Sequence, residues 1–419
     1  MAQACILRRG DKAAVDRFCR KIEVEFGYKA IMDTKVSHPA GHRYSPIPRP
    51  EGAGRIALVL QGGGALGAYQ AGVYQSLHEA GLEPDWVSGV SIGAINAALI
   101  AGNPPERRLA ALCEFWDRIT NRTVWPYTPD GDIWRQARNT ISSLTTVLFG
   151  QPGLFDPHRI NPWLLPAGNK NATSFYDNNP MRQILRELVD IDLLNNGDVH
   201  FAVGSVNVQN GNFVFFDNRK IEITIDHIMA SGALPPAFPM VEIGTDHFWD
   251  GGIVSNTPLQ HLLAQDDDIN SLVFQVDLFS ATGPLPRTMT EVLERHKDIT
   301  YSSRTRQVTD MFTRLQRWKQ RAYDALVKVP DADLSDEQRA TRDKLAKLPQ
   351  ATILQLIYQK KSYEGNARDY DFSPDSMHEH WKNGHEDTTR SLQRSDWLQM
   401  PPKGVGIVSH DVHREYESR

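Results

Sequence analysis

The sequence predicts an α/β fold with a mainly parallel sheet flanked by helices, and an additional helical region at the C-terminus. Residues 56–60 form a continuous apolar run of strand length, followed by a glycine turn and a helical pattern. A second strand-and-helix pair follows at once, at residues 86–101. Alternating strands and helices at this spacing are typical of parallel sheets. Beyond about residue 283 the chain becomes charged and helical in its pattern.

Composition excludes several classes of function. The 419 residues include 46 basic and 51 acidic side chains, for a net charge of −5, so we expect no nucleic-acid partner. Cys5, Cys19 and Cys113 are widely spaced and predict neither a disulfide framework nor a thiolate metal site. We find no signal-peptide core and no apolar stretch of about 18 residues. The expectation is a cytoplasmic protein whose membrane contact, if any, is peripheral; the oligomeric state stays open.

The first elements can be assigned in order. Residues 56–60 are expected to be a strand buried on both faces. The helix that follows places five apolar residues on one face and is closed by Gly81. The five are Leu66, Tyr69, Val73, Leu77 and Ala80. Residues 86–88 form a short strand, and residues 92–101 form a helix that is apolar all round and therefore buried.

Residues 120–170 have a different character, with aromatic residues among prolines and glycines and a helical stripe that begins at Trp134. They are interpreted as an insertion on the α/β core. An ordinary covering layer is the favoured interpretation, because aromatic stripes at helical spacing usually belong to a core. The alternative is a lid or a lipid-facing cap.

The rest of the chain completes the domain assignment. Residues 201–208 and 213–217 are expected to form a hairpin across Asn210-Gly211, and residues 272–276 another strand. We therefore predict an N-terminal helix and Pro/Gly-rich linker at 1–54, an α/β domain at 55–280, and a mostly helical extension at 281–419. Within the extension, residues 304–321 form a basic amphipathic helix that either lies on a membrane or, as favoured here, packs on the domain.

The glycine turn after the first strand has two functional interpretations. Gly62, Gly63, Gly64 and Gly67 satisfy the G-x-G-x-x-G pattern of dinucleotide sites, but the acidic residue Asp85 lies at the wrong end of the second strand for that role. Alternatively, glycine N–H groups at a helix N-terminus can hold the negative oxygen of a tetrahedral intermediate. Gly62, Gly63 and Gly64 are therefore candidates for an oxyanion hole.

A candidate nucleophile follows the second strand. Gly89-Val90-Ser91-Ile92-Gly93 is a G-x-S-x-G element with a strand before it and a helix of small residues after it. This strand–turn–helix setting is the one that a nucleophile elbow requires. Gly89 and Gly93 allow the sharp turn that presents the Ser91 hydroxyl.

The base that activates Ser91 is predicted to be an aspartate. No histidine has a setting that selects it; His378, His380 and His385 share a helix, where metal ligation is disfavoured against a solvated face. Asp250 stands in Phe248-Trp249-Asp250-Gly251-Gly252. Neighbouring aromatic residues can exclude water from its carboxyl group and raise its pKa toward that of a useful base.

These three elements, Gly62-Gly63-Gly64, Gly-x-Ser91-x-Gly and Asp250-Gly251-Gly252, resemble the patatin-like phospholipase family in their order. The resemblance covers about residues 55–280, and the C-terminal region resembles an extension of a bacterial subgroup. It implies a three-layer α/β/α fold and a serine lipid acyl hydrolase with Ser91 as nucleophile and Asp250 as its only catalytic partner. Many members carry a basic residue where this chain has Leu66.

The resemblance also implies a mechanism and a ligand. A lipid ester would acylate Ser91, water would release the acid, and no metal or cofactor would take part. The apolar residues of 120–170, Trp134 among them, and the segment from Leu234 to Phe238 are candidates for the acyl groove. An acyltransferase with the same acyl-enzyme and a non-catalytic lipid-binding protein remain as alternatives.

Overall fold

The computed structural model describes residues 46–120, 151, 153–265, 267–303, 305–360, 368–402 and 405–411. The helical stripe expected from Trp134 onward lies outside these residues, as does most of the N-terminal segment. Within them, no helix is both long and apolar enough to cross a bilayer.

The described strands form one large sheet in the order β11-β10-β9-β1-β2-β5-β8-β7, with β6 paired to β5. Neighbours from β11 to β5 are parallel, whereas the pairs β5–β6, β5–β8 and β8–β7 are antiparallel. The expected mainly parallel sheet is therefore confirmed. The strands are β1 (Arg55–Leu60), β2 (Trp86–Gly89), β5 (His200–Asn207), β6 (Phe213–Asp217), β7 (Val241–Ile243), β8 (Asp246–Asp250), β9 (Ser271–Asp277), β10 (Ala351–Ile357) and β11 (Ile407–Asp411).

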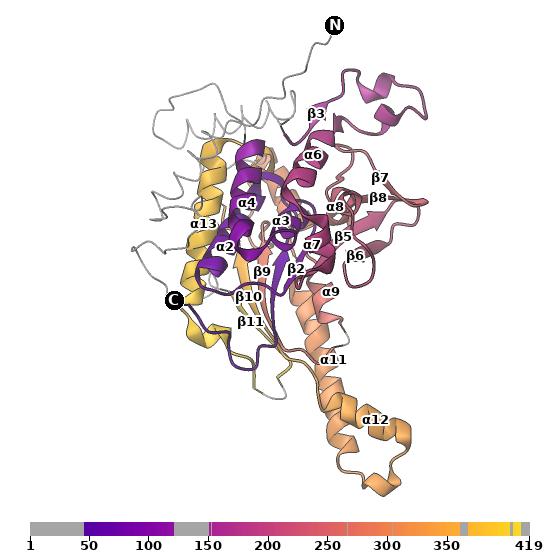
Figure 1. Cartoon of the computed structure of the whole chain (residues 1–419), viewed down its shortest axis with the longest axis vertical. Helices are drawn as coiled ribbons and strands as arrows, with labels where there is room; N and C mark the ends of the chain where they lie inside the picture. The colour runs from indigo at the N-terminus through magenta and orange to yellow at the C-terminus, as the bar shows by residue number, and fades with distance from the viewer. Residues whose placement is uncertain are drawn as a thin grey trace.

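Helices cover both faces of this sheet (Figure 1). Because side chains alternate along a strand, β1 sends Ile56, Leu58 and Leu60 into a large core and Ala57 and Val59 into a smaller one. The helices of the large core include α2 (Ala68–Glu79), α3 (Ile92–Ala101), α4 (Pro105–Ile119), α6 (Asn179–Leu188), α7 (Ile191–Asn196), α8 (Ile225–Ser231) and α13 (Pro374–Leu392). The smaller core packs against α9 (Leu259–Leu263) and α11 (Thr305–Leu326). The sheet and the helices on its two faces form the three layers that the resemblance implied.

Helix α2 differs from the expectation of a single apolar face, because α13 covers the side that was expected to meet water. Two glycines let the helices approach closely. A Cβ at Gly72 would lie 1.9 Å from the Trp381 carbonyl oxygen, and one at Gly384 would lie 2.0 Å from the Tyr69 carbonyl oxygen. Residues 68–77 of α2 are consequently buried on all sides.

The C-terminal region contains the expected helices, α10 (Met289–Tyr301), α11, α12 (Asp336–Leu345) and α13, and also two strands that the sequence analysis did not predict. β10 pairs with β9, and β11 pairs with β10, so this region extends the same sheet. The division of the chain at residue 280 stays a prediction.

A buried aspartate connects three elements near the amino end of β5. The Asp217 carboxylate accepts hydrogen bonds from His200 Nε2 at 2.8 Å, His261 Nε2 at 2.9 Å and the Arg219 N–H at 2.9 Å. Burial alone would raise the pKa of Asp217, but these hydrogen bonds hold it well below its usual range. The ionised carboxylate therefore ties β5, β6 and α9 together.

We expect Asp217→Ala to lower the free energy of unfolding by about 2–4 kcal/mol at pH 7, because it removes a buried, fully hydrogen-bonded carboxylate. The loss should shrink below about pH 4, since a depressed pKa stabilises the fold only above the unfolded-state value. Urea unfolding of wild type and variant at several pH values measures this. Exposed Asp246 is the control, and its alanine variant should change stability by less than about 0.5 kcal/mol. An equal effect of the two variants would contradict the role of Asp217.

Candidate active site

Three chain segments meet at the carboxyl edge of the parallel strands. β1 leads into the glycine turn, β2 leads into Ser91, and β8 ends at Asp250 beside Ser205 of β5. The glycines, Ser91 and Asp250 all line one cavity of about 150 Å³. Residues that are far apart in the sequence are thus brought to a single site.

Ser91 has a strained backbone that presents its side chain to the cavity. Its φ of 57° makes it the non-glycine residue with positive φ among those described. The neighbouring glycines are required by close backbone contacts. A Cβ at Gly89 would lie 2.2 Å from the Gly93 backbone, and one at Gly93 would lie 2.4 Å from the Leu60 carbonyl oxygen. The turn has the geometry of a nucleophile elbow, with α3 beginning at the next residue.

Asp250 is 1% exposed and lies within hydrogen-bonding reach of Ser91. The Gly252 N–H donates to its Oδ1 at 2.7 Å. Burial raises the pKa of Asp250 to about 7, and the hydrogen bonds from Ser91 and Gly252 oppose that rise. A carboxyl group with such a pKa can both accept and return a proton near neutral pH.

The glycine turn offers backbone donors to the same cavity. The Gly62 N–H already donates to the Asn256 carbonyl at 3.3 Å. No hydrogen bond within the described residues uses the N–H groups of Gly63 and Gly64. These two N–H groups, at the start of η1 (Gly64–Gly67) and α2, are therefore the ones that could receive a negatively charged oxygen.

Leu66 does not contribute to the cavity. Its side chain is fully buried in the large core, next to the helices that cover β1. Leu66, where the resemblance led us to expect a basic residue in many family members, is thus a core residue in this chain.

A second cavity of about 80 Å³ adjoins Ser91 and is lined mainly by apolar side chains. Its walls include Ile92, Ile95, Leu154, Met181, Ile228, Met229, Phe238 and Phe372. Of the residues expected to form an acyl groove, Phe155 and Leu234 line the first cavity, and Leu154 and Phe238 line both. Trp134 lies outside the described residues.

Five residues of the C-terminal region that the sequence did not indicate line the first cavity. These are Lys297, Tyr301, Asp369, Tyr370 and Phe372. Lys297 forms an ion pair with Asp369, and its Nζ lies 5.3 Å from the centre of the Tyr370 ring. A Cβ at Gly64 would lie 2.3 Å from the Asp369 carbonyl oxygen, so this wall is in direct contact with the glycine turn. No local pattern links these residues to the motifs.

Two amide side chains hold the site together. Asn256 Nδ2 donates to the carbonyl oxygens of Gly62 and Tyr301, both at 3.0 Å. Gln61 Nε2 donates to the same Tyr301 carbonyl at 2.9 Å, and its Oε1 accepts the N–H groups of Leu278 and Phe279. The glycine turn and α10 are therefore positioned together.

The alternative sites considered from the sequence have structural explanations. His380 Nδ1 lies 3.0 Å from the Tyr358 hydroxyl, and His385 Nε2 lies 2.8 Å from Glu79. Both histidines are buried, so the expected solvated face is wrong, and the described residues contain no cluster able to hold a metal ion. Asp85 forms an ion pair with Arg49 and accepts the Ile56 N–H, at the opposite end of β2 from Ser91.

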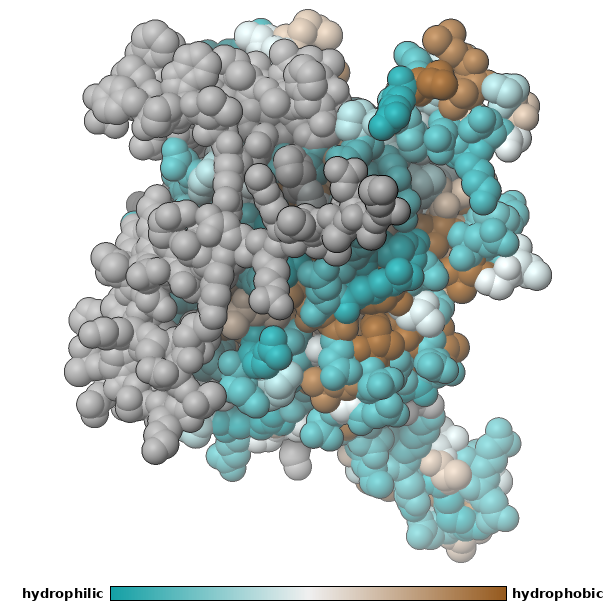
Figure 2. All heavy atoms as spheres, turned by 45° about the horizontal axis from the view of Figure 1, so that its top comes forward, coloured by the Kyte–Doolittle hydropathy of each residue, from teal (hydrophilic) through white to brown (hydrophobic). Residues whose placement is uncertain are grey.

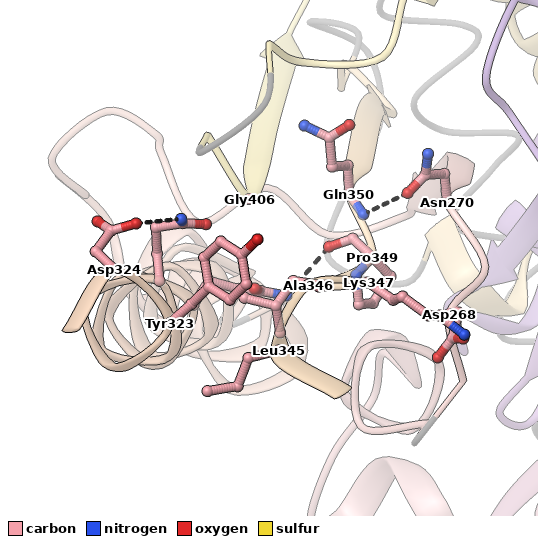
Figure 3. Close-up of a pocket in the computed structure, with 13 residues that line it drawn as sticks. Asp268, Asn270, Tyr323, Asp324, Leu345, Ala346, Lys347, Pro349, Gln350 and Gly406 are labelled. Carbon is pink, nitrogen blue, oxygen red and sulfur yellow. Dashed lines mark hydrogen bonds and ion pairs between the residues drawn. The ribbon is translucent and has the colours of Figure 1, made fainter. Parts of the chain in front are cut away.

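A larger cavity of about 740 Å³ lies between α11, the end of α12 and the start of β10 (Figure 3). Its polar groups bond largely to one another. The Gln350 N–H donates to Asn270 Oδ1 at 2.8 Å, and Gln316 Nε2 donates to the Pro349 carbonyl at 3.2 Å. Among the residues that the structure describes, no serine, cysteine or histidine lines it.

Two family models match segments of this chain. A family model described as patatin-like phospholipase matches residues 58–263, and one described as patatin phospholipase matches residues 299–404. The first match contains the glycine turn, Ser91 and Asp250. The second contains most of the residues that close the cavity from the C-terminal region.

Individual relatives match over short segments. A triacylglycerol lipase of Schizosaccharomyces pombe is 45% identical over 111 residues, 25% of this chain and 22% of that protein. A lysophospholipase of Aspergillus terreus is 54% identical over 46 residues, 11% of this chain and 3% of that protein. The neuropathy target esterase of Drosophila melanogaster is 45% identical over 65 residues, 15% of this chain and 4% of that protein. The chain thus matches a minor part of each relative.

Among solved structures, VipD from Legionella pneumophila aligns with 81% of this chain and 67% of its own. The sequence identity is 15% and the TM-score is 0.37, values too low to support an argument about function or fold.

The burial of Asp250 predicts a pH-dependent loss of stability. Its raised pKa means that the folded protein becomes less stable as pH rises from about 4, the unfolded-state value, to about 7. Asp250→Asn removes this ionisation and should raise the free energy of unfolding at pH 8 by about 2–4 kcal/mol, with a smaller gain at pH 5. Urea unfolding at the two pH values measures both gains.

Asp277 provides a matched comparison, because burial also raises its pKa, to about 6, and it does not line the cavity. Asp277→Asn should also gain more stability at pH 8 than at pH 5. If Asp250→Asn gained nothing at pH 8, the carboxyl group of Asp250 would not be held away from water.

Proposed function

The chain belongs to the patatin-like phospholipase family, and we propose that it is a serine lipid acyl hydrolase that acts through Ser91 and Asp250. One observation carries this proposal. A carboxyl group that is 1% exposed, and whose pKa burial raises to about 7, lies beside a serine in a strained strand-to-helix turn, and both residues line one cavity. Such a pair is suited to remove a proton from the serine hydroxyl near neutral pH.

The first half of the proposed reaction forms an acyl-enzyme. Asp250 takes the proton of Ser91 as its Oγ attacks the ester carbonyl, and the resulting oxyanion is stabilised by the N–H groups of Gly63 and Gly64. Each well-placed donor of this kind lowers a barrier by roughly 3–4 kcal/mol. The tetrahedral intermediate then breaks its bond to the alcohol, which leaves with the proton from Asp250.

The second half returns the enzyme to its starting state. A water molecule gives a proton to Asp250 and attacks the acyl carbonyl, and the same N–H groups stabilise the new oxyanion. The bond to Ser91 Oγ breaks, Ser91 recovers the proton, and the carboxylic acid leaves. Product analysis distinguishes this hydrolysis from acyl transfer to another alcohol.

The two cavities at Ser91 suggest how a lipid ester is oriented. The apolar cavity suits the acyl chain, whereas the cavity that contains Lys297, Asp369 and two tyrosines suits the polar alcohol part. A lipid substrate presented by an aggregate also requires peripheral contact with a lipid surface. The cytoplasmic location expected from the sequence stays a prediction.

Reaction with a fluorophosphonate probe tests the serine directly. Intact mass spectrometry should find one adduct on the wild-type protein and none on Ser91→Ala. Asp250→Asn should react about 10²–10⁴-fold more slowly, because the general base is lost. The wild-type rate should rise with pH through about 7, as Asp250 loses its proton.

Two variants control for indirect effects on this labelling. Ser255→Ala changes an exposed serine near the site, and Asp277→Asn changes the other buried aspartate with a raised pKa. Both should label at the wild-type rate. Absence of labelling on the wild type, with detergent present, would refute the hydrolase assignment.

The apolar cavity predicts a dependence on acyl-chain length. Phe238 lines both cavities and packs against Phe155, with ring centres 5.2 Å apart. Phe238→Ser should lower kcat/KM about 10-fold or more for p-nitrophenyl octanoate but little for the acetate, since each buried methylene contributes about 0.8 kcal/mol.

Phe175→Ser is the matched control, because Phe175 is a partly exposed phenylalanine nearby that lines neither cavity. It should leave the ratio of the two kcat/KM values at the wild-type level. An unchanged ratio in Phe238→Ser would show that the acyl chain binds elsewhere.

A further inference from the structure

A short segment projects from the molecule next to the candidate site. It lies between β3 (Asp156–Pro157) and β4 (Tyr176–Asp177), which pair with each other, and it extends outward at the upper right of Figure 1. Its base is anchored by the N–H groups of Phe175 and Tyr176, which donate to the carbonyl oxygens of Pro236 and Ala237 at 3.1 and 2.9 Å.

The end of this segment holds large apolar side chains in water. Trp163 is 84% exposed, Leu164 is 78% exposed and Ile160 is 55% exposed. Trp163 and Leu164 belong to η2 (Pro162–Leu164), and Ile160 precedes it. No residue of η2 is buried. Figure 2 shows apolar side chains, in brown, at the end of the projection. We call residues 159–165 the apolar tip.

The shape of the apolar tip is built by local hydrogen bonds. The Asn161 side chain accepts the Trp163 N–H at 3.1 Å, and the Leu164 N–H donates to the Asn161 carbonyl at 2.9 Å. The turn is thereby set without any burial of Trp163 or Leu164. Their exposure is a property of the folded segment and needs an explanation in terms of what they contact.

The charged residues of the segment between β3 and β4 are basic. Between Pro157 and Tyr176 the charged residues are Arg159 and Lys170, with no aspartate or glutamate, although the whole chain has a net charge of −5. An exposed tryptophan and leucine flanked by cations fit the interfacial region of an anionic lipid surface, where indole rings and basic side chains are favoured.

The apolar tip is coupled to the candidate site through a shared wall. Phe155, directly before β3, lines the cavity of Ser91. Its ring centre lies 4.7 Å from that of Tyr176 in β4 and 5.2 Å from that of Phe238. A surface that holds the apolar tip would therefore lie near the entrance through which a lipid reaches Ser91.

We propose that the apolar tip is the lipid-docking element of this protein, and that Ile160, Trp163 and Leu164 insert into an anionic lipid surface. The inference rests on the proposed function in one respect, since the docked lipid is also taken to supply the substrate. It deepens that function by assigning the surface that faces the lipid.

The amphipathic helix α11 is the competing surface. It exposes Met311, Leu315 and Trp318, which are 51%, 48% and 63% exposed. However, α11 and α12 form an arm that extends away from the sheet at the opposite end of the molecule from the projection (Figure 1). Docking by this arm would hold the cavity of Ser91 away from the lipid.

Sedimentation with vesicles of phosphatidylcholine and phosphatidylglycerol distinguishes the two surfaces. The variant Trp163→Ser/Leu164→Ser should lower the partition coefficient about 10-fold or more, because two interfacial apolar side chains are lost. The matched variant Trp318→Ser/Leu315→Ser, which removes the same residue types from α11, should bind as the wild type does. The reverse result would overturn the proposal, as would equal binding by all three proteins.

Two further measurements distinguish lipid docking from a failure of the hydrolase assignment and from dimerisation through the apolar tip. Labelling of Ser91 by a soluble fluorophosphonate should be equal in wild type and Trp163→Ser/Leu164→Ser, which shows that the variant is folded. If no protein is labelled, the hydrolase assignment fails while sedimentation still tests docking. If the wild type is a dimer without lipid and the variant is a monomer, the apolar tip joins two copies of the chain and the proposal is wrong.

Discussion

The placement of Ser91 beside the buried carboxyl group of Asp250 is the constraint around which the candidate site is organised. Water stabilises the ionised form of a carboxyl group and keeps its pKa low. The group is a useful base near neutral pH only where water is excluded and the hydroxyl is already in place. The strained turn of Ser91 and the short strand β8 hold the two groups together. Gly89, Gly93 and Gly251 lie next to these residues, and backbone atoms occupy the space that a Cβ would need at each of them.

Exclusion of water at this contact depends on parts of the chain that are distant in sequence. The C-terminal region contributes two strands to the sheet and closes the cavity through α10 and the segment at residues 368–372. The buried Arg368 fastens that segment to α10, with bonds to Glu294 at 3.1 Å and to Asp298 at 2.5 Å. Because α13 also packs closely on α2, the helix behind the glycine turn is held from both sides.

The carboxyl and amino ends of the strands carry different kinds of residues. The carboxyl edge of the parallel strands carries Ser91, the two cavities and, through Phe155, the base of the apolar tip. At the amino ends of strands, polar groups are tied into internal networks, such as Asp217 with its two histidines and Asp85 with Arg49. This arrangement follows the general tendency of open α/β sheets to bind ligands beyond the carboxyl ends of their strands.

The sequence by itself determined the features that depend on neighbours along the chain. Apolar runs and turn residues located five of the strands, including the hairpin at Asn210-Gly211. The three glycine-containing motifs predicted Ser91 and Asp250 as a catalytic pair, and this stays a prediction. Only the tertiary structure decided which partners lie across space. It showed that the Gly62 N–H is already bonded to Asn256, that Leu66 is a core residue, that α13 buries the second face of α2, and that Lys297 and Asp369 close the cavity. Periodicity reports whether a face is buried, but the identity of what buries it depends on long-range packing that no local pattern encodes.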